Sequence, residues 1–295
     1  NSLLDQTTAA CNLADRHGYP GFSGIREVDA ILDRANRGGC LNNIELLNVA
    51  DVLSCSRKAK AYFDSDSSDN ILKPFFVSLV PNKFLEERIQ TSIISPDEIA
   101  DAASDELADI RRHMRVQSAK IKDSLQKIIS SSAYSKFLQD PIITMRQGRY
   151  VVPVKSECKN DIPGLVHDVS STGSTYFIEP MSAVNANNAL RELELREKKE
   201  IERILFELSS LVAAHKDDIA SNVMLLVQLD VIFAKARLAA SMRAWAPELN
   251  DRGIVELREA RHPLIDPKSV VPISVKLGAE FDTMIITGPN TGGKT

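Results

Sequence analysis

The sequence is short of aromatic residues and of long apolar runs. Phe, Trp and Tyr make up 5% of the 295 residues, with one Trp among them. This scarcity is more typical of a helix-rich, elongated chain than of a compact all-β barrel. No apolar stretch approaches the ~18 residues that a helix needs to cross a bilayer. We therefore expect no membrane partner.

Cysteine and positive charge are limited as well. The four Cys form no CxxC pair and the five His are scattered, so no zinc framework is expected. Unpaired thiols are typical of a cytoplasmic protein.

The formal net charge is −4, so any nucleic-acid binding must come from a local basic patch. The chain starts with neither Met nor a signal peptide, and we expect it to be part of a longer protein.

The first half of the chain is predicted to be helical. Helices are expected over 27–35, stopped by Gly38-Gly39, and over 43–62. The segment Ser95-Pro96-Asp97-Glu98 combines a capping residue, a proline suited to the first helical turn and an acid for a capping box. Apolar residues then recur at helical steps, which predicts one helix over 97–139, about 60 Å long.

Residues 142–179 change to a pattern typical of β-hairpins. Short runs rich in β-branched and aromatic residues alternate with turn sequences such as Gln147-Gly148. The expected strands are Ile142–Arg146, Tyr150–Ser156, Gly164–Asp168 and Thr175–Ile178.

A second long helical segment is expected after Pro180. Its apolar stripe extends to about Trp245, with a break near Lys216. The simplest architecture is an antiparallel helical arm with a small β unit at its far end. The fold class is therefore mostly α with small β parts (α+β). The expected domains are a helical core with the outgoing helix, a β insertion, the returning helices and the edge of an ATPase domain, over 1–140, 141–179, 180–248 and 249–295.

The end of the sequence carries a phosphate-binding motif. Strands are expected over Ile254–Glu259, Ile273–Leu277 and Met284–Thr287, and the last leads directly into GPNTGGKT. This octapeptide matches the Walker A pattern GxxxxGK[ST]. The alternative interpretation is a plain glycine-rich turn. The candidate cofactor-binding residues are Gly288, Pro289, Asn290, Thr291, Gly292, Gly293, Lys294 and Thr295.

The chemistry expected of this loop is the binding of ATP with Mg²⁺. Glycines allow successive backbone amides to surround the phosphates, and a helix starting in the loop would add its dipole. Lys294 would contact the β and γ phosphates, and the Thr295 hydroxyl would bind Mg²⁺. The sequence stops at Thr295, before any Walker B acid. We therefore expect no catalytic residues in these 295 residues and no ATP hydrolysis by this chain alone.

Four cations lie on or beside the predicted β unit, namely Arg146, Arg149, Lys155 and Lys159. Acidic residues are interleaved with them. One interpretation is a set of phosphate contacts to nucleic acid. The other is a solvated hairpin surface, and the residues alone leave both open.

Several segments resemble the MutS family of DNA mismatch-repair and related proteins. They are MIITGPNTGGKT, the upstream RHPLI, and LDVIFAKARLA, which is similar to the end of that family's lever helices. The stretch RYVVPVKSECKNDIPGLVHDVSSTGSTYFIEP resembles the MutS-two branch, and so does SGIREVDAILDRANRGGCLNNIELLNVADVL. The resemblance extends over almost the whole chain.

The resemblance implies more than the residues show. It implies a homodimer that closes around branched or mismatched DNA, with the β unit as a clamp on the lever arm. Stalled ribosomes and their rRNA are further implied partners. Endonuclease activity is implied for an Smr domain that lies outside this sequence.

Two other interpretations remain open at this point. An ABC- or SMC-type ATPase also combines a P-loop with long helical arms, and its signature motif would follow Thr295. A helical scaffold with a decayed ATP site is the second alternative, and an intact Walker B acid would argue against it.

Overall fold

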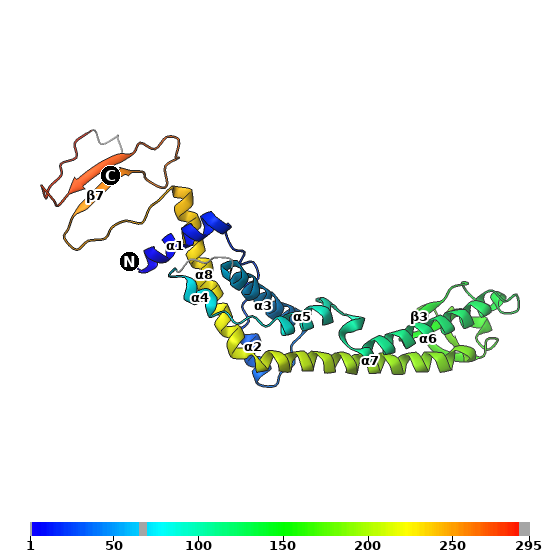
Figure 1. The fold of residues 1–295 in the computed structure, drawn as a ribbon. Coiled ribbons are helices and arrows are strands. Elements are labelled where there is room, and N and C mark those ends of the chain that lie inside the picture. Colours follow the sequence, from blue (N-terminus) through cyan, green and yellow to red (C-terminus); the bar gives the residue numbers. More distant parts are fainter. Residues whose placement is uncertain (1, 65–69, 289–295) are drawn as a thin grey trace. The chain divides into compact units, whose positions relative to one another are not determined.

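The computed structural model describes residues 2–64 and 70–288 (Figure 1). The chain divides into two compact units. The terminal unit comprises Asn1–Phe22, Lys58–Leu79 and Met224–Thr295. The arm unit comprises Ser23–Arg57 and Val80–Val223. Helices α3 (Asn43–Asp64) and α8 (Lys216–Met242) contribute residues to both units. The mostly helical fold class with small β parts is confirmed.

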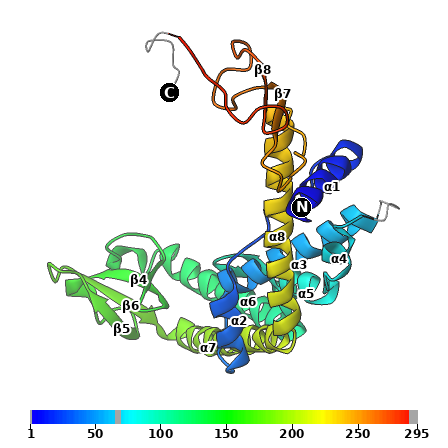
Figure 2. The same ribbon diagram turned by 90° about the vertical axis from the view of Figure 1, so that its left-hand side faces the viewer.

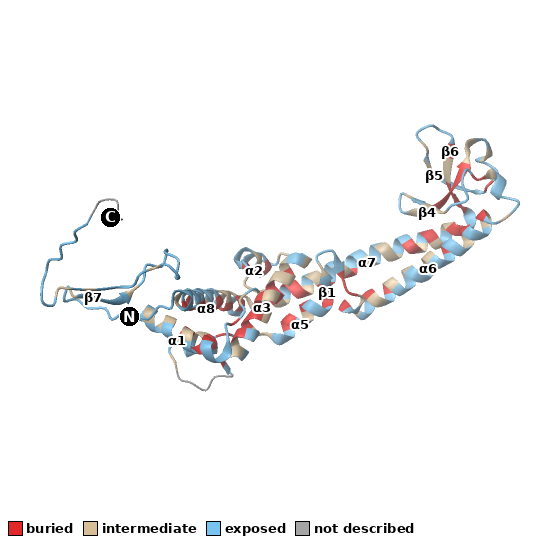
Figure 3. Ribbon diagram, turned by 90° about the horizontal axis from the view of Figure 1, so that it is seen from above, coloured by how far each residue is buried: buried red, intermediate tan, exposed pale blue. Residues whose placement is uncertain are grey.

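Two long helices form the arm. Helices α6 (Asp105–Ile129) and α7 (Met181–Ala214) lie side by side and run antiparallel (Figure 1). Their antiparallel register follows from cross-helix pairs, since Ser104 bonds Glu200 while Ser124 bonds Ser182. The buried residues of each helix form a stripe at helical spacing (Figure 3), as the sequence pattern predicts.

The arm starts later than the sequence indicates. The predicted helix start at Ser95-Pro96-Asp97-Glu98 is wrong, because these residues form the turn between β1 (Ile93–Ser95) and β2 (Glu98–Ile99). A 3₁₀ turn over Asp101–Ala103 follows, and Ser104 is the true N-cap of α6. Its hydroxyl accepts a hydrogen bond from the Leu107 amide at 3.0 Å, which satisfies one free donor of the first turn.

The outgoing helix also ends early, at Ile129 rather than near 139. Three consecutive serines follow it, and their hydroxyls compete with the helical backbone pattern. The Ser130 hydroxyl donates to the Gln126 carbonyl at 2.7 Å. A 3₁₀ turn over Ser135–Phe137 then brings Leu138 to the β unit, where it forms an isolated bridge with Val154.

The predicted β unit is confirmed. Its strands are β3 (Thr144–Arg146), β4 (Arg149–Lys155), β5 (Gly164–Val169) and β6 (Thr175–Pro180). They form an antiparallel sheet in the order β3-β4-β6-β5. Figure 2 shows β4, β6 and β5 side by side in this order. Gly164 is required at the start of β5, because a Cβ there would lie 2.3 Å from the Glu179 carbonyl oxygen.

The sheet packs against the end of the arm, as expected. One apolar cluster joins the last turns of α6 and the first turns of α7 to β4 and β6. Its buried members are Ile121, Leu125, Ile129, Leu138, Val152, Val154, Ile162, Ile178, Ala183 and Leu190. The predicted return of helix after Pro180 is confirmed, as is the break near Lys216. Helix α7 ends at Ala214, His215 caps it, and α8 begins at Lys216.

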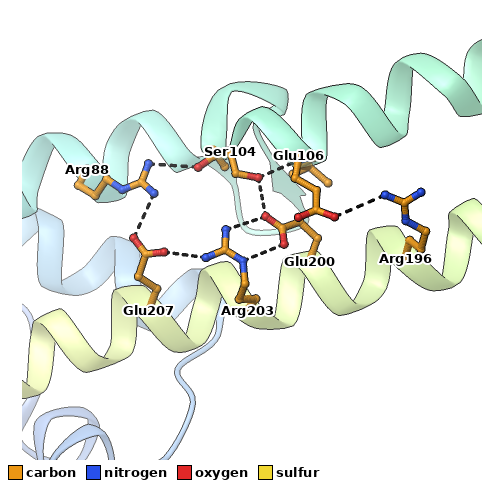
Figure 4. Close-up of polar contacts among 9 residues, drawn as sticks. Arg88, Ser104, Glu106, Arg196, Glu200, Arg203 and Glu207 are labelled. Atoms are coloured by element: carbon orange, nitrogen blue, oxygen red, sulfur yellow. Dashed lines mark hydrogen bonds and ion pairs between the residues drawn. The ribbon is translucent and has the colours of Figure 1, made fainter.

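A polar network fixes the start of α6 onto α7 (Figure 4). The Ser104 hydroxyl donates to the buried Glu200 carboxylate at 2.6 Å, and Arg203 donates to both oxygens of Glu200. Arg88 donates to the Ala103 carbonyl and to Glu207. Because Glu200 is almost fully buried, these hydrogen bonds offset the cost of removing its charge from water.

The terminal unit has an aromatic core and a small sheet. Helices α1 (Ser2–His17) and α4 (Lys73–Val77) belong to it. Phe63 and Phe76 are stacked with their ring centroids 4.8 Å apart, and Phe233 of α8 meets Phe76 edge-on. Strands β7 (Val255–Ala260) and β8 (Ile273–Leu277) pair antiparallel, which confirms two of the three strands expected after residue 250.

The third expected strand, Met284–Thr287, is not formed. Ile285 and Ile286 are 82% and 69% exposed. An apolar strand of this kind is buried only when neighbouring strands pair with it. Within the described residues the terminal unit provides only the β7–β8 pair, and neither strand pairs with this segment.

No helix among the described residues is long and apolar enough to cross a membrane.

Candidate nucleic-acid interface

Positive charge is concentrated on one stretch of the arm unit. Between Arg111 and Lys159 the sequence holds eleven Lys and Arg against three Asp and Glu, a local net charge of +8. The whole chain carries −4, so the other residues together carry −12. This stretch includes most of α6 and strands β3 and β4. Charge is therefore unevenly distributed along the sequence, although the net charge of the chain is negative.

Three lysines of α6 are available on this surface. Lys120, Lys122 and Lys127 are exposed, and none has an ion-pair partner among the described residues. Lys120 and Lys127 are seven residues apart, so they lie on the same side of the helix. Arg115 is also exposed, and a single 3.3 Å contact joins it to Asp101. An unpaired, solvated cation can neutralise a phosphate without first losing a partner.

Three of the four cations predicted from the sequence lie on or beside the sheet, and each makes one or two contacts with neighbouring residues. Arg146 lies 3.4 Å from Asp168 and stacks over the Phe177 ring at 4.1 Å. Lys155 donates to the Lys136 carbonyl at 3.1 Å. Lys159 lies over the Tyr176 ring, 5.5 Å from its centroid.

Arg149 has a different environment, because it faces a buried carboxylate. Its Nη1 donates to the two oxygens of Glu179 at 2.9 and 3.1 Å, and Nη2 donates to Asn188 at 2.7 Å. The Glu179 side chain is fully buried, and His167 contacts its second oxygen. A charge removed from water in this way requires such partners.

Asn187 of α7 completes the network around Glu179. Its amide donates to Glu179 at 2.7 Å and to the Tyr150 carbonyl at 3.2 Å. The Tyr150 amide in turn donates to the Asn187 side-chain oxygen at 3.2 Å. Asn187 thus bonds both backbone groups of one β4 residue, and the network fixes the sheet to the returning helix.

Sequence reasoning missed the α6 lysines. The sequence pattern confines the predicted site to the β unit, because the charge of the preceding helix stands out only when helix and β unit are taken as one stretch. A charge count over successive windows finds the region directly. The structure adds that this helix packs against β4, so the two sources of charge belong to the same end of the arm.

The P-loop residues can be placed only in part. Gly288 has a φ of +148°, a value suited to glycine, and nothing lies within 4 Å of where a Cβ would be. Residues 289–295 lie outside the described part of the chain. The predicted roles of Lys294 and Thr295 toward ATP and Mg²⁺ therefore stay predictions.

Comparison with known proteins gives relatives that all carry the same name. The chain is 47% identical over 294 residues to "Endonuclease MutS2" of Acetivibrio thermocellus, covering 98% of this chain. It is 50% identical over 295 residues to the protein of the same name in Caldanaerobacter subterraneus subsp. tengcongensis. The match to that of Ruminiclostridium cellulolyticum is 44% over 296 residues. The chain spans 37% of the length of each of these relatives. No family model matches.

Proposed function

We propose that this chain, which belongs to the MutS2 branch of the MutS family, binds nucleic acid through the basic surface of its arm. The surface comprises the exposed lysines of α6 and the cations of the β unit. Membership of this branch removes the ABC- and SMC-type interpretation. The name of these relatives, an endonuclease, supports a nucleic-acid ligand for the whole protein.

The observation that carries this proposal is the local charge of +8 between Arg111 and Lys159 in a chain of net charge −4. Part of this charge has no structural partner, because the exposed α6 lysines make no ion pair within the described residues. A phosphate backbone is the common biological ligand that gains most from a row of solvated cations.

The further properties of the whole protein belong to the same proposal. We place ATP and Mg²⁺ at Gly288–Thr295, with Lys294 on the phosphates and Thr295 on the metal. The ligand would be branched or mismatched DNA, or the rRNA of a stalled ribosome, held by a homodimer. Endonuclease activity would come from other parts of the protein. Four free cysteines suit a cytoplasmic location.

A binding experiment with matched variants tests the arm surface. Fluorescence anisotropy would compare a labelled duplex bound by the wild type, by Lys120→Ala/Lys127→Ala, and by Lys198→Ala/Lys199→Ala. The last pair removes two exposed lysines from α7, within a mixed-charge run, and matches the first in charge lost. We expect the α6 pair to weaken binding about tenfold at low salt and the α7 pair to change it little.

Two results would contradict the proposal. One is equal weakening by the α6 and α7 pairs, which would mean that overall charge alone matters. The other is no measurable binding by the wild type at low salt. Thermal unfolding followed by circular dichroism would show that all three chains are equally folded.

A further inference from the structure

Two adjoining depressions lie beside α6, close to where it meets the sheet. One, of about 360 Å³, is lined by residues of α6, β3 and β4 and by Ile143, which precedes β3. The other, of about 510 Å³, is lined by α6, α7 and the same β4 residue. Lys122 and Tyr150 line both depressions, so the two form one groove with these side chains at its centre. Each is within the size range of sites for small organic molecules.

The groove combines an aromatic face with cations. Lys122 Nζ lies 5.9 Å from the centre of the Tyr150 ring, and Lys122 has no ion-pair partner among the described residues. Arg115 lines the second depression and is well exposed. Hydrogen-bonding side chains complete the walls, namely those of Ser118, Gln126 and Thr144.

Acidic residues also line the groove, and one of them is paired with an arginine of its wall. Glu197 accepts a hydrogen bond from Arg111 at 2.6 Å, and Arg111 also donates to Asp101 at 2.7 Å, so this trio is internally paired. Asp123 is the other acid lining the groove. Arg115 contacts Asp101 at 3.3 Å, so Lys122 is the cation of the groove that has no ion pair within the described residues, and the Tyr150 ring lies between the two halves of the groove.

An aromatic ring flanked by cations is how proteins hold a single nucleotide without reading its sequence. Every base has a flat face that stacks on an aromatic side chain, while the neighbouring phosphate binds a cation. In a fully paired duplex the base faces are already stacked on each other. A ring of this kind therefore favours unpaired nucleotides, such as those at a branch, a bulge or a single-stranded end.

We propose that the groove centred on Lys122 and Tyr150 binds one unpaired nucleotide of a branched nucleic acid. The base stacks on Tyr150, and the phosphate contacts Lys122 and Arg115. This inference rests on the proposed function, which supplies the nucleic acid, and it adds the site on the arm at which an unpaired nucleotide is held. The lysines on the other side of α6 then contact the flanking backbone of either class of ligand.

The test compares two ligands and three variants by fluorescence anisotropy. One ligand is a fully paired duplex, and the other is the same duplex carrying one unpaired 2-aminopurine. Tyr150→Leu removes the aromatic face but keeps an apolar side chain toward the sheet core, and Tyr150→Phe keeps the face. Tyr134→Leu is the matched control, because Tyr134 is exposed on the turn after α6 and lines neither depression.

We expect the wild type to bind the bulged ligand about tenfold more tightly than the duplex, within the range measured for base–aromatic stacking. Tyr150→Leu should lose this preference and keep its affinity for the duplex. Tyr150→Phe and Tyr134→Leu should retain the preference. Stacking should also quench 2-aminopurine emission with the wild type and Tyr150→Phe, and not with Tyr150→Leu.

Each contrary outcome has a distinct meaning. If the wild type binds both ligands equally, or if Tyr150→Leu keeps the preference, the groove proposal is overturned and the basic surface stands. If the wild type binds neither ligand, the proposed function is overturned together with the groove. Should Tyr150→Leu be poorly folded, Lys122→Ala serves instead. It should reduce the preference for the bulged ligand, and an unchanged preference would overturn the groove proposal.

Discussion

Arg149 and Glu179 are 30 positions apart in sequence and form a two-oxygen ion pair, with Nη1 of the arginine 2.9 and 3.1 Å from the carboxylate oxygens. The pair joins β4 to β6 where Glu179 is fully buried. Removing one member of such a pair leaves an uncompensated charge in the interior. The pair therefore holds the sheet together, in addition to any role that Arg149 has toward a ligand.

We predict that Arg149→Ala destabilises the β unit by about 3 kcal/mol, the usual cost of breaking a buried pair. Hydrogen exchange of the β4 and β6 amides would measure it, since the effect is local to the sheet. Lys159→Ala, on the same unit but with only a ring contact, is the control and should change little. Equal protection in both variants would show that the Arg149–Glu179 pair contributes nothing to the sheet.

The start of the arm should be sensitive to acid. Hydrogen bonds from Arg203, then from Ser104, hold the pKa of Glu200 below its usual range. Arg111 lowers the pKa of Asp101 in the same way. Because these pKa values are lowered on folding, the stabilisation is fully present above the unfolded values near 4. It is lost as pH falls through the lowered folded values.

Glu200→Gln should therefore flatten the fall in unfolding free energy between about pH 5 and pH 3. Urea unfolding at several pH values would measure this, with Glu106→Gln as control. Glu106 is an exposed carboxylate whose one ion pair, with Arg196, spans 3.5 Å. An identical pH dependence in the wild type and Glu200→Gln would contradict this account of the network.

We predict that the N-cap of α6 is Ser104 and that Ser95 has no capping role. Ser104→Ala should lower the free energy of unfolding by about 1 kcal/mol for the lost cap, and by more because Glu200 also loses a hydrogen-bond donor. Ser95→Ala should have little effect, because Ser95 lies in the β1–β2 turn and makes only a 3.4 Å contact with the Asp97 amide. Denaturant midpoints of the two variants would decide, and a larger loss from Ser95→Ala would reverse the assignment.

A chain of these 295 residues should show no ATP turnover above background. A P-loop positions phosphate through backbone amides that extend from a formed strand, and residues 284–287 form no strand. The measurement is phosphate release by the wild type and by Lys294→Ala, which should be indistinguishable. Turnover that Lys294→Ala abolishes would show that the loop is assembled and active in this chain.

The sequence predicted those helices and strands that are specified by a pattern of neighbouring residues. Alternation of β-branched residues identified all four strands of the β unit, and Pro180 marked the start of α7. The start of α6 was wrong because the signal is ambiguous. Ser-Pro-Asp-Glu suits a helix N-terminus and a tight turn equally, and the pairing of Ile93 with Ile99 decided for the turn.

The candidate site was predictable only in part, because it depends on register and packing. Nothing local distinguishes Arg149 from Arg146, which is its direct partner across β3 and β4. Only the pairing of β4 with β6 brings Arg149 to Glu179. In the same way, Tyr150 reads as an ordinary strand residue until the packing of α6 places Lys122 beside its ring.

The most direct test of the basic arm surface is the salt dependence of duplex binding. Each phosphate that the protein neutralises adds about 0.9 to the slope of log K against log salt concentration. The wild type would be compared with a variant in which Lys120, Lys127, Lys155 and Lys159 are all Ala. We predict that the variant binds more weakly to every sequence and that its slope is shallower by about 2 to 4. A slope equal to that of the wild type would mean that the arm surface does not contact the phosphate backbone.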